Sequence, residues 1–93
     1  MRTLHIPLKA EYFHAIKRGD KPDEYRLQTR YWRKRLEGRE YDQIEFTLGY
    51  PPRDCTERRI TRPWRGYRET VITHPHFGPA PVAVFAIGAN PGA

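Results

Sequence analysis

A lysine, a glutamate and an arginine stand close together in the segment GDKPDEYR, which covers residues 19–26. They are Lys21, Glu24 and Arg26. Two cations supply hydrogen-bond donors for the oxygens of a ligand, and the carboxylate between them supplies an acceptor for an N–H group. The spacing indicates a pocket for a polar, partly anionic ligand. Charged residues at a turn also occur as a solvated ion pair without a binding role, so both interpretations stay open here.

The elements around this segment follow from hydrophobic periodicity. Residues 4–8 alternate between apolar and polar side chains, which predicts a strand with one buried face. Residues 10–18 follow a helical period, and Gly19 is placed to end that helix. Pro22 disfavours a helical conformation just before it, so the chain must extend there. The next residues, 23–28, predict a strand on which the glutamate and the arginine share one face.

The rest of the chain predicts one more helix and three more strands. These are a helix at residues 30–38 and strands at 44–48, within 58–73 and at 81–89. The last strand is apolar on both faces and should be fully buried. About five short strands and two short helices predict an α+β fold, namely a small mixed β-barrel with helices packed at its ends, or alternatively an open sheet. We expect one domain over residues 1–90 and a tail at 91–93.

The basic residues are concentrated in the middle of the chain. The formal net charge is +6, and residues 26–68 hold 12 lysines and arginines against 6 aspartates and glutamates. Nearly all of these cations are arginines, which bind phosphate in a bidentate manner and stack on bases. RNA or a nucleotide is therefore the expected partner. A solubilising basic surface and an acidic protein partner are the alternatives.

A second candidate region is the segment RRITRPWRGYRET, in which arginine recurs at every third residue beside two aromatic residues. Six of its side chains could contact RNA: Arg59, Arg62, Trp64, Arg65, Tyr67 and Arg68. Arginines interleaved with exposed aromatic rings would form a stacking rim for unpaired bases. A period of three matches neither a strand nor an α-helix and predicts an irregular or polyproline-like loop. The alternative is that Trp64 and Tyr67 anchor the core.

Two histidines in THPHFG, His74 and His76, would point the same way on a strand. With Lys21 they could supply the general base and general acid that metal-independent RNA cleavage requires. Histidines beside prolines also serve in packing and hydrogen bonding. A metal site needs more ligands, and the remaining histidines and Cys55 lack ligand spacing. We therefore predict no metal and no cofactor.

The chain contains one cysteine and no apolar run long enough for a signal peptide or a membrane span. A single cysteine cannot form an intramolecular disulfide and suits a reducing compartment. We expect a cytoplasmic protein without a membrane partner.

The segment that ends at Arg26 resembles the signature of a known family. The motif F..I..G.K..E.R, here Phe13, Ile16, Gly19, Lys21, Glu24 and Arg26, is similar to that of ASCH domains, small β-barrel proteins of the PUA-like group. The order of a strand, a helix ending in Gly-x-Lys and a strand bearing Glu-x-Arg also fits. The resemblance implies a cleft beside the motif and a role in binding RNA. Some members are described as ribonucleases, and a related small group hydrolyses the amide of N4-acetylated cytidine.

The resemblance implies that Lys21 is a site residue and that Glu24 and Arg26 contact the ligand or support the lysine. The amidohydrolase group has a threonine nucleophile three positions after that lysine, where this chain has Glu24. A glutamate cannot replace a hydroxyl in forming an ordinary acyl ester, which argues against that activity. We therefore expect an ASCH-type domain that binds single-stranded or structured RNA, or a modified nucleotide within it. A small hydrolase acting on RNA or on an acylated nucleoside is the alternative, with Lys21, Glu24, His74 and His76 as its catalytic residues.

Overall fold

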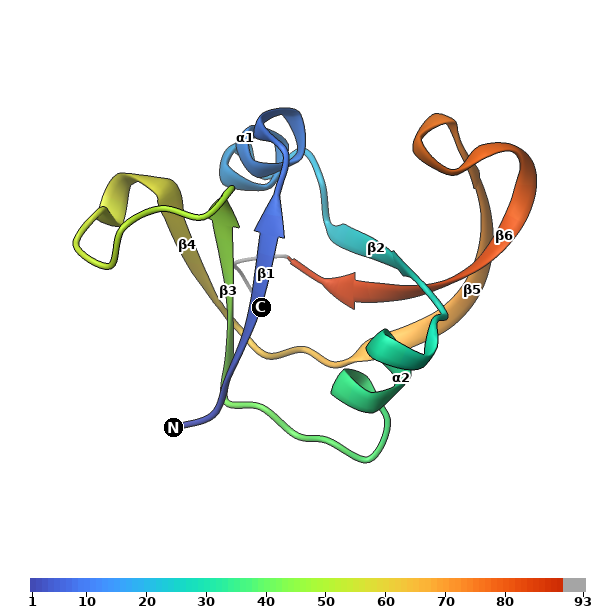
Figure 1. Ribbon diagram of the computed structural model, residues 1–93, viewed down its shortest axis with the longest axis horizontal. Helices are drawn as coiled ribbons and strands as arrows, with labels where there is room; N and C mark the ends of the chain where they lie inside the picture. The colour runs from blue at the N-terminus through green and yellow to red at the C-terminus, as the bar shows by residue number, and fades with distance from the viewer. Residues whose placement is uncertain (90–93) are drawn as a thin grey trace.

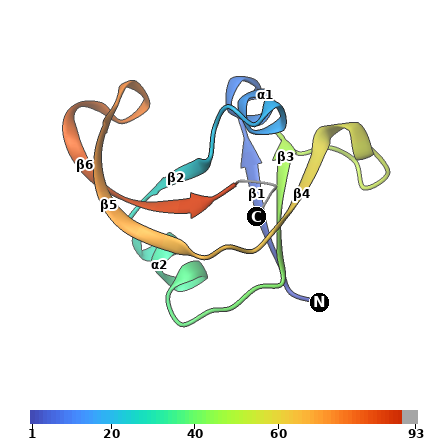
Figure 2. The ribbon, with the colours of Figure 1, turned by 180° about the vertical axis from the view of Figure 1, so that it is seen from behind.

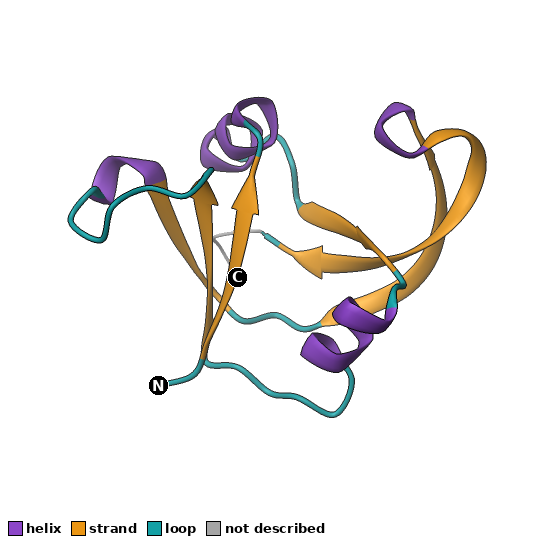
Figure 3. Cartoon of the chain, in the orientation of Figure 1, coloured by secondary structure: helices purple, strands orange, loops and turns teal. Residues whose placement is uncertain are grey.

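The computed structural model describes residues 1–89, so the predicted tail at 91–93 lies outside the described residues. Within residues 1–89 the fold is α+β, with six strands and two α-helices (Figures 1 and 3). In chain order the elements are β1 (Thr3–Leu8), α1 (Ala10–Arg18), β2 (Asp23–Leu27), α2 (Arg30–Leu36), β3 (Gln43–Leu48), the 3₁₀ turn η1 (Thr56–Arg58), β4 (Arg59–Pro63), β5 (Tyr67–His74), the 3₁₀ turn η2 (Pro75–Phe77) and β6 (Gly78–Gly88). The predicted α+β class and the two short helices are confirmed.

The strands form two separate three-stranded sheets. One has the order β1-β3-β4, with β1 parallel to β3 and β3 antiparallel to β4. The other has the order β2-β6-β5 and is antiparallel throughout. Figures 1 and 2 show that the strands of the first sheet run steeply across those of the second, seen from either side.

No closed barrel forms within residues 1–89, so the open alternative describes the sheets and the count is six strands rather than five. Closing the sheets into a barrel would need ladders between their edge strands, β1 and β4 in one sheet and β2 and β5 in the other. One such ladder would join β1 and β2, which lie on either side of α1 in the sequence. A side chain bridges these two strands instead, because the Arg26 guanidinium donates a 2.9 Å hydrogen bond to the Pro7 carbonyl oxygen. This bridge sits beside the candidate site.

Both helices begin and end within one turn of the residues that the sequence predicts. Gly19 has φ = 85°, and its N–H closes α1 on the carbonyl oxygens of Ala15 and Ile16. In α2 the Thr29 hydroxyl accepts a hydrogen bond from the backbone N–H of Trp32, an N-cap of the ordinary kind. Both helices are therefore defined by local signals, and the first turn of each contributes residues to the candidate site.

The core lies where the two sheets and the two helices meet. It consists of alternate residues of β1, β3 and β6 together with three side chains from the two helices, one from β4 and one that follows β6: Leu4, Ile6, Leu8, Phe13, Ile16, Leu36, Ile44, Phe46, Ile60, Phe85, Ile87 and Ala89. Burying twelve apolar side chains supplies the main stabilisation of so small a domain.

The prediction of a loop in the arginine-rich segment is wrong. Residues 59–74 hold two strands, β4 and β5, joined by a short link that includes Trp64 and Gly66. Ile60 is buried opposite Phe46, and this apolar pairing across β3 and β4 outweighs the three-residue arginine period.

The prediction of a fully buried strand at residues 81–89 holds for only part of it. Residues Val84–Ile87 and Ala89 are buried, whereas Pro81 and Ala83 are exposed. The reason is the pairing, because β2 covers β6 only from Val84 to Gly88, and the earlier part of β6 pairs with β5 alone. No helix among the described residues is long and apolar enough to cross a membrane.

Candidate functional site

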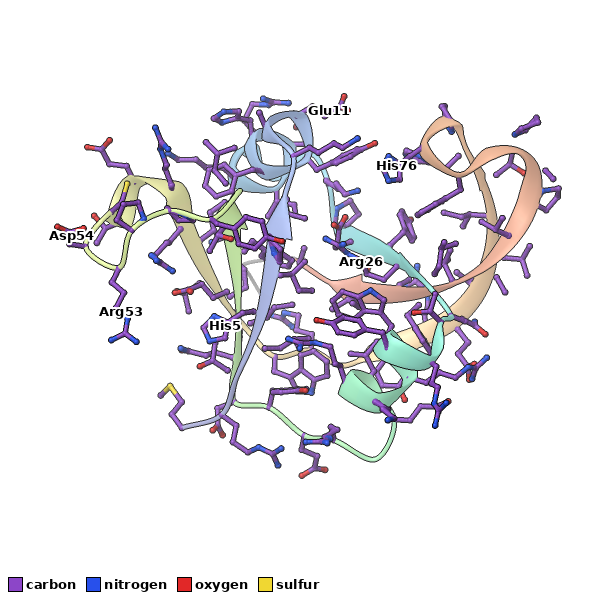
Figure 4. All side chains as sticks on the ribbon, in the orientation of Figure 1. His5, Glu11, Arg26, Arg53, Asp54 and His76 are labelled. Carbon is purple, nitrogen blue, oxygen red and sulfur yellow. The ribbon has the colours of Figure 1, made fainter. Side chains whose placement is uncertain are left out.

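A cleft of about 340 Å³ lies between the two sheets on the side of α1. Its wall is formed by the end of β1, the first turn of α1, β2, the beginning of α2 and the η2 turn. Figure 4 shows Arg26 between β2 and β1, and His76 at the tip of the β5–β6 hairpin on the side that faces α1. The cleft therefore collects residues that lie far apart in the sequence.

The predicted triad forms the floor of this cleft. Glu24 is only 5% exposed. Its Oε1 lies 3.1 Å from the Lys21 ammonium, and its Oε2 accepts a 3.0 Å hydrogen bond from the Arg26 guanidinium. The Oε1 atom also accepts from the backbone N–H of Tyr25 at 3.2 Å. A carboxylate buried this deeply needs such partners, and here each oxygen has a cationic one.

Aromatic rings enclose the two cations of the triad. The Lys21 ammonium lies 4.6 Å from the ring centroid of Tyr12 and 5.3 Å from that of Tyr25. The guanidinium of Arg26 lies 5.2 Å from the Trp32 ring. These are cation–π distances, so the rings hold the two charges in place. The N–H groups of the two cations remain available to a ligand.

The two predicted histidines line the same cleft and lie near the ring of Tyr12. Their ring centroids are 6.1 Å (His74) and 5.9 Å (His76) from that of Tyr12. The Nδ1 atom of His74 accepts a hydrogen bond from the backbone N–H of His76, so the neutral His74 ring carries its proton on Nε2. His74 ends β5 and His76 sits in the η2 turn, so they do not share one strand face as predicted.

The phenol of Tyr12 lies near Lys21 and near both histidines. Burial raises its pKa above the ordinary value, and the negative charges of Glu11 and Glu24 raise the pKa further. The phenol is therefore neutral at pH 7 and can donate a hydrogen bond in the cleft.

The predicted arginine and aromatic rim does not line this cleft. Arg59, on the other sheet, donates hydrogen bonds to Glu45 and to the carbonyl oxygens of Pro51 and Pro52 in the loop after β3. Arg62 is half-buried on β4 beside them in the same sheet. These two arginines are thus built into the β1-β3-β4 sheet.

The aromatic members of the rim pack against the core, which is the alternative stated for them above. Trp64 packs edge-on against Tyr41, and Tyr67 packs edge-on against Phe85.

The remaining arginines of the rim, Arg65 and Arg68, are exposed and line a second hollow of about 330 Å³. Arg68 forms an ion pair with Asp23 at 3.1 Å, and this hydrogen bond raises the pKa of its guanidinium.

The aromatic wall of the cleft is what sequence reasoning missed. Its members are Tyr12, Tyr25, Tyr31, Trp32 and Phe77. Three of them directly precede or follow residues already singled out in the motif or in the histidine pair. The usable signal was the placement of tyrosines beside Phe13, Glu24 and Arg26, which periodicity assigns to packing.

The residues of the cleft carry more positive than negative charge. Among the described residues, Lys9, Lys21 and Arg26 line it together with a single carboxylate, that of Glu24. Among residues 1–89 no group of three or more histidine, cysteine, aspartate or glutamate side chains is arranged to hold a metal ion.

The fold and the cleft together define a small α+β protein with a cationic, aromatic-walled pocket. Comparison of the chain with protein-family models, with curated proteins and with solved structures finds no match in any of the three.

Proposed function

We propose that this protein binds RNA by taking one unpaired nucleotide into the cleft. The observation that supports this most directly is the pairing of a donor-rich floor, made by Lys21 and Arg26, with a wall of aromatic rings. Aromatic rings stack on any base, and cations bind its polar edge or the adjoining phosphate. The volume of about 340 Å³ falls in the range of small-ligand sites, roughly 300 to 1,000 Å³.

The RNA on either side of the bound nucleotide would follow exposed basic residues at the start of α1 and on α2. Lys9 lies at the start of α1 and lines the cleft. On α2, Arg30 and Lys34 are exposed and one turn apart, and Tyr31 between them is 60% exposed. This path replaces the β4–β5 rim as the main phosphate-binding surface. The PUA-like and ASCH relationship suggested by the motif belongs to the same proposal.

The test is fluorescence anisotropy of an end-labelled single-stranded RNA titrated with protein at several salt concentrations. We expect saturable binding that weakens as salt increases, because phosphate contacts release counterions. Lys21→Ala should weaken binding by about tenfold, while Lys17→Ala, which removes an exposed lysine at the end of α1, should change it less than twofold. Equal effects of the two substitutions, in proteins that remain folded, would contradict the assignment of the cleft.

A second candidate function is cleavage of RNA without a metal. It is favoured by one observation, the convergence of His74, His76 and Lys21 around Tyr12. A base would take the proton of a 2′-hydroxyl as its oxygen attacks the adjacent phosphorus, and an acid would protonate the departing 5′ oxygen. A time course of the same RNA on a denaturing gel distinguishes this from binding. Cleavage should yield a 2′,3′-cyclic phosphate end and be lost in His74→Ala or His76→Ala.

A further inference from the structure

We infer that the cleft prefers nucleotides whose base carries a carbonyl oxygen where others carry an amino group. It should thus take uracil or guanine in preference to cytosine or adenine. This inference rests on the proposed function and specifies the ligand of the same site. It is carried by the balance of donors and acceptors on the cleft floor.

The carboxylate of Glu24 on the floor has little acceptor capacity left. Oε1 of Glu24 already accepts from the Lys21 ammonium at 3.1 Å and from the Tyr25 backbone N–H at 3.2 Å. Oε2 accepts from Arg26 at 3.0 Å. A carboxylate oxygen accommodates about two hydrogen bonds, so one position remains for a ligand on the whole group.

The two cations keep several donors free. Lys21 has three N–H bonds, and within the described residues its ammonium has one polar partner, Glu24. Arg26 uses Nη2 for both of its hydrogen bonds, to Glu24 and to the Pro7 carbonyl oxygen. Its Nη1 has no hydrogen-bond partner among residues 1–89. The floor therefore presents more donors than acceptors to whatever enters.

The edges of the four bases differ in whether they present hydrogen-bond acceptors or donors to this floor. Guanine presents the acceptors O6 and N7, and uracil presents O4, whereas cytosine and adenine present an amino donor at the equivalent position. An amino group facing the ammonium of Lys21 or the guanidinium of Arg26 would lose its water without gaining an acceptor. A site whose buried polar groups are left unpaired rejects such a ligand strongly.

The experiment uses four RNA nonamers that contain cytosine at every position except the central one, which is uracil, guanine, cytosine or adenine. Phosphate number and length are the same in all four, so differences in anisotropy titrations report the central base. We expect the uracil and guanine nonamers to bind about tenfold more tightly than the other two. Equal affinities would overturn the inference.

Two variants test whether the floor causes the preference. Arg26→Gln removes Nη1, and Lys21→Gln removes the ammonium; in each the preference should fall to about twofold or less. The matched control is Arg59→Gln, because Arg59 also bridges a carboxylate and prolyl carbonyl oxygens but lies outside the cleft. The control should keep the full preference. Thermal melting followed by circular dichroism verifies the fold, and Lys21→Gln decides the matter if Arg26→Gln unfolds.

The outcomes also separate this inference from the function on which it rests. Salt-dependent binding with no base preference would remove the inference and leave RNA binding standing, and it would indicate that the floor holds a phosphate. Absence of binding to all four nonamers at low salt would overturn both.

Discussion

The two sheets carry the same electrostatic unit in different surroundings. In the β2-β6-β5 sheet, Arg26 bonds Glu24 and the carbonyl oxygen of Pro7. In the β1-β3-β4 sheet, Arg59 bonds Glu45 and the carbonyl oxygens of two prolines. Each carboxylate also has a second basic partner, Lys21 for Glu24 and His5 for Glu45.

The two units differ in solvent exposure and in the groups that surround them. Side-chain exposure is 6% for Glu24 and 16% for Lys21, against 17% for Glu45 and 62% for His5. Aromatic rings contact both cations of the first unit, and a cleft opens above it. The second unit lies outside both hollows described above.

The comparison shows that an arginine–glutamate pair does not by itself make a ligand site. The Arg59 guanidinium donates hydrogen bonds that hold the loop after β3, whereas the Arg26 guanidinium keeps N–H groups unbonded within residues 1–89 beside the cleft. Burial among rings makes each remaining charge more effective, because the local dielectric is lower than in water. Three substitution experiments can break or sharpen this comparison.

The largest expected effect is on stability. Within residues 1–89, Glu24→Ala leaves Lys21 without a polar partner and Arg26 with a single carbonyl, so it should lower the free energy of unfolding by about 3 kcal/mol. Glu45→Ala should lower it by about 1 kcal/mol or less, because Arg59 keeps its carbonyl partners and His5 is exposed. Urea unfolding at pH 7 measures both. Similar losses would show that the two units are energetically equivalent and would remove the distinction.

The second experiment compares RNA affinity and stability after substitution of two tryptophans, one in each region. Trp32 contacts Arg26 in the cleft, whereas Trp64 packs on Tyr41 outside it. Trp32→Ala should weaken RNA binding by roughly tenfold, the effect of losing one stacking ring. Trp64→Ala should lower the free energy of unfolding by about 2 kcal/mol and leave affinity within twofold.

Both tryptophans contact the core, so Trp32→Ala also costs stability, and titrations must be run where each variant is fully folded. Affinity that falls equally in the two variants would mean that RNA does not use the cleft wall.

Local signals account for what the sequence predicted well. Gly19 ends α1, Thr29 caps α2, and the alternation along β1 and β3 assigns their buried faces. The triad could be predicted for the same reason, since Lys21, Glu24 and Arg26 are separated by a few residues. Their contacts depend on one turn and one strand.

Long-range pairing accounts for what the sequence did not predict. The arginine period at residues 59–68 gave no sign that Ile60 would pair opposite Phe46 and convert a predicted loop into a strand. Likewise, the meeting of Tyr12 with His76 depends on how the β5–β6 hairpin curves toward α1. No local pattern in either segment encodes that distance, so the aromatic wall became visible only in the folded chain.

The smallest expected effect concerns Tyr12, whose ring lies near the Lys21 ammonium and both histidines. Its pKa is raised, by burial first and by the charges of Glu11 and Glu24 next. Stability contributed by the neutral phenol is thus complete below the ordinary pKa of 10.0 and is lost as pH rises through the higher folded value. Ultraviolet titration of tyrosinate in the wild type minus Tyr12→Phe should show a single transition above pH 10. A transition at or below pH 10 in this difference would show that Tyr12 is solvated. The aromatic wall would then not adjoin the charged floor of the cleft.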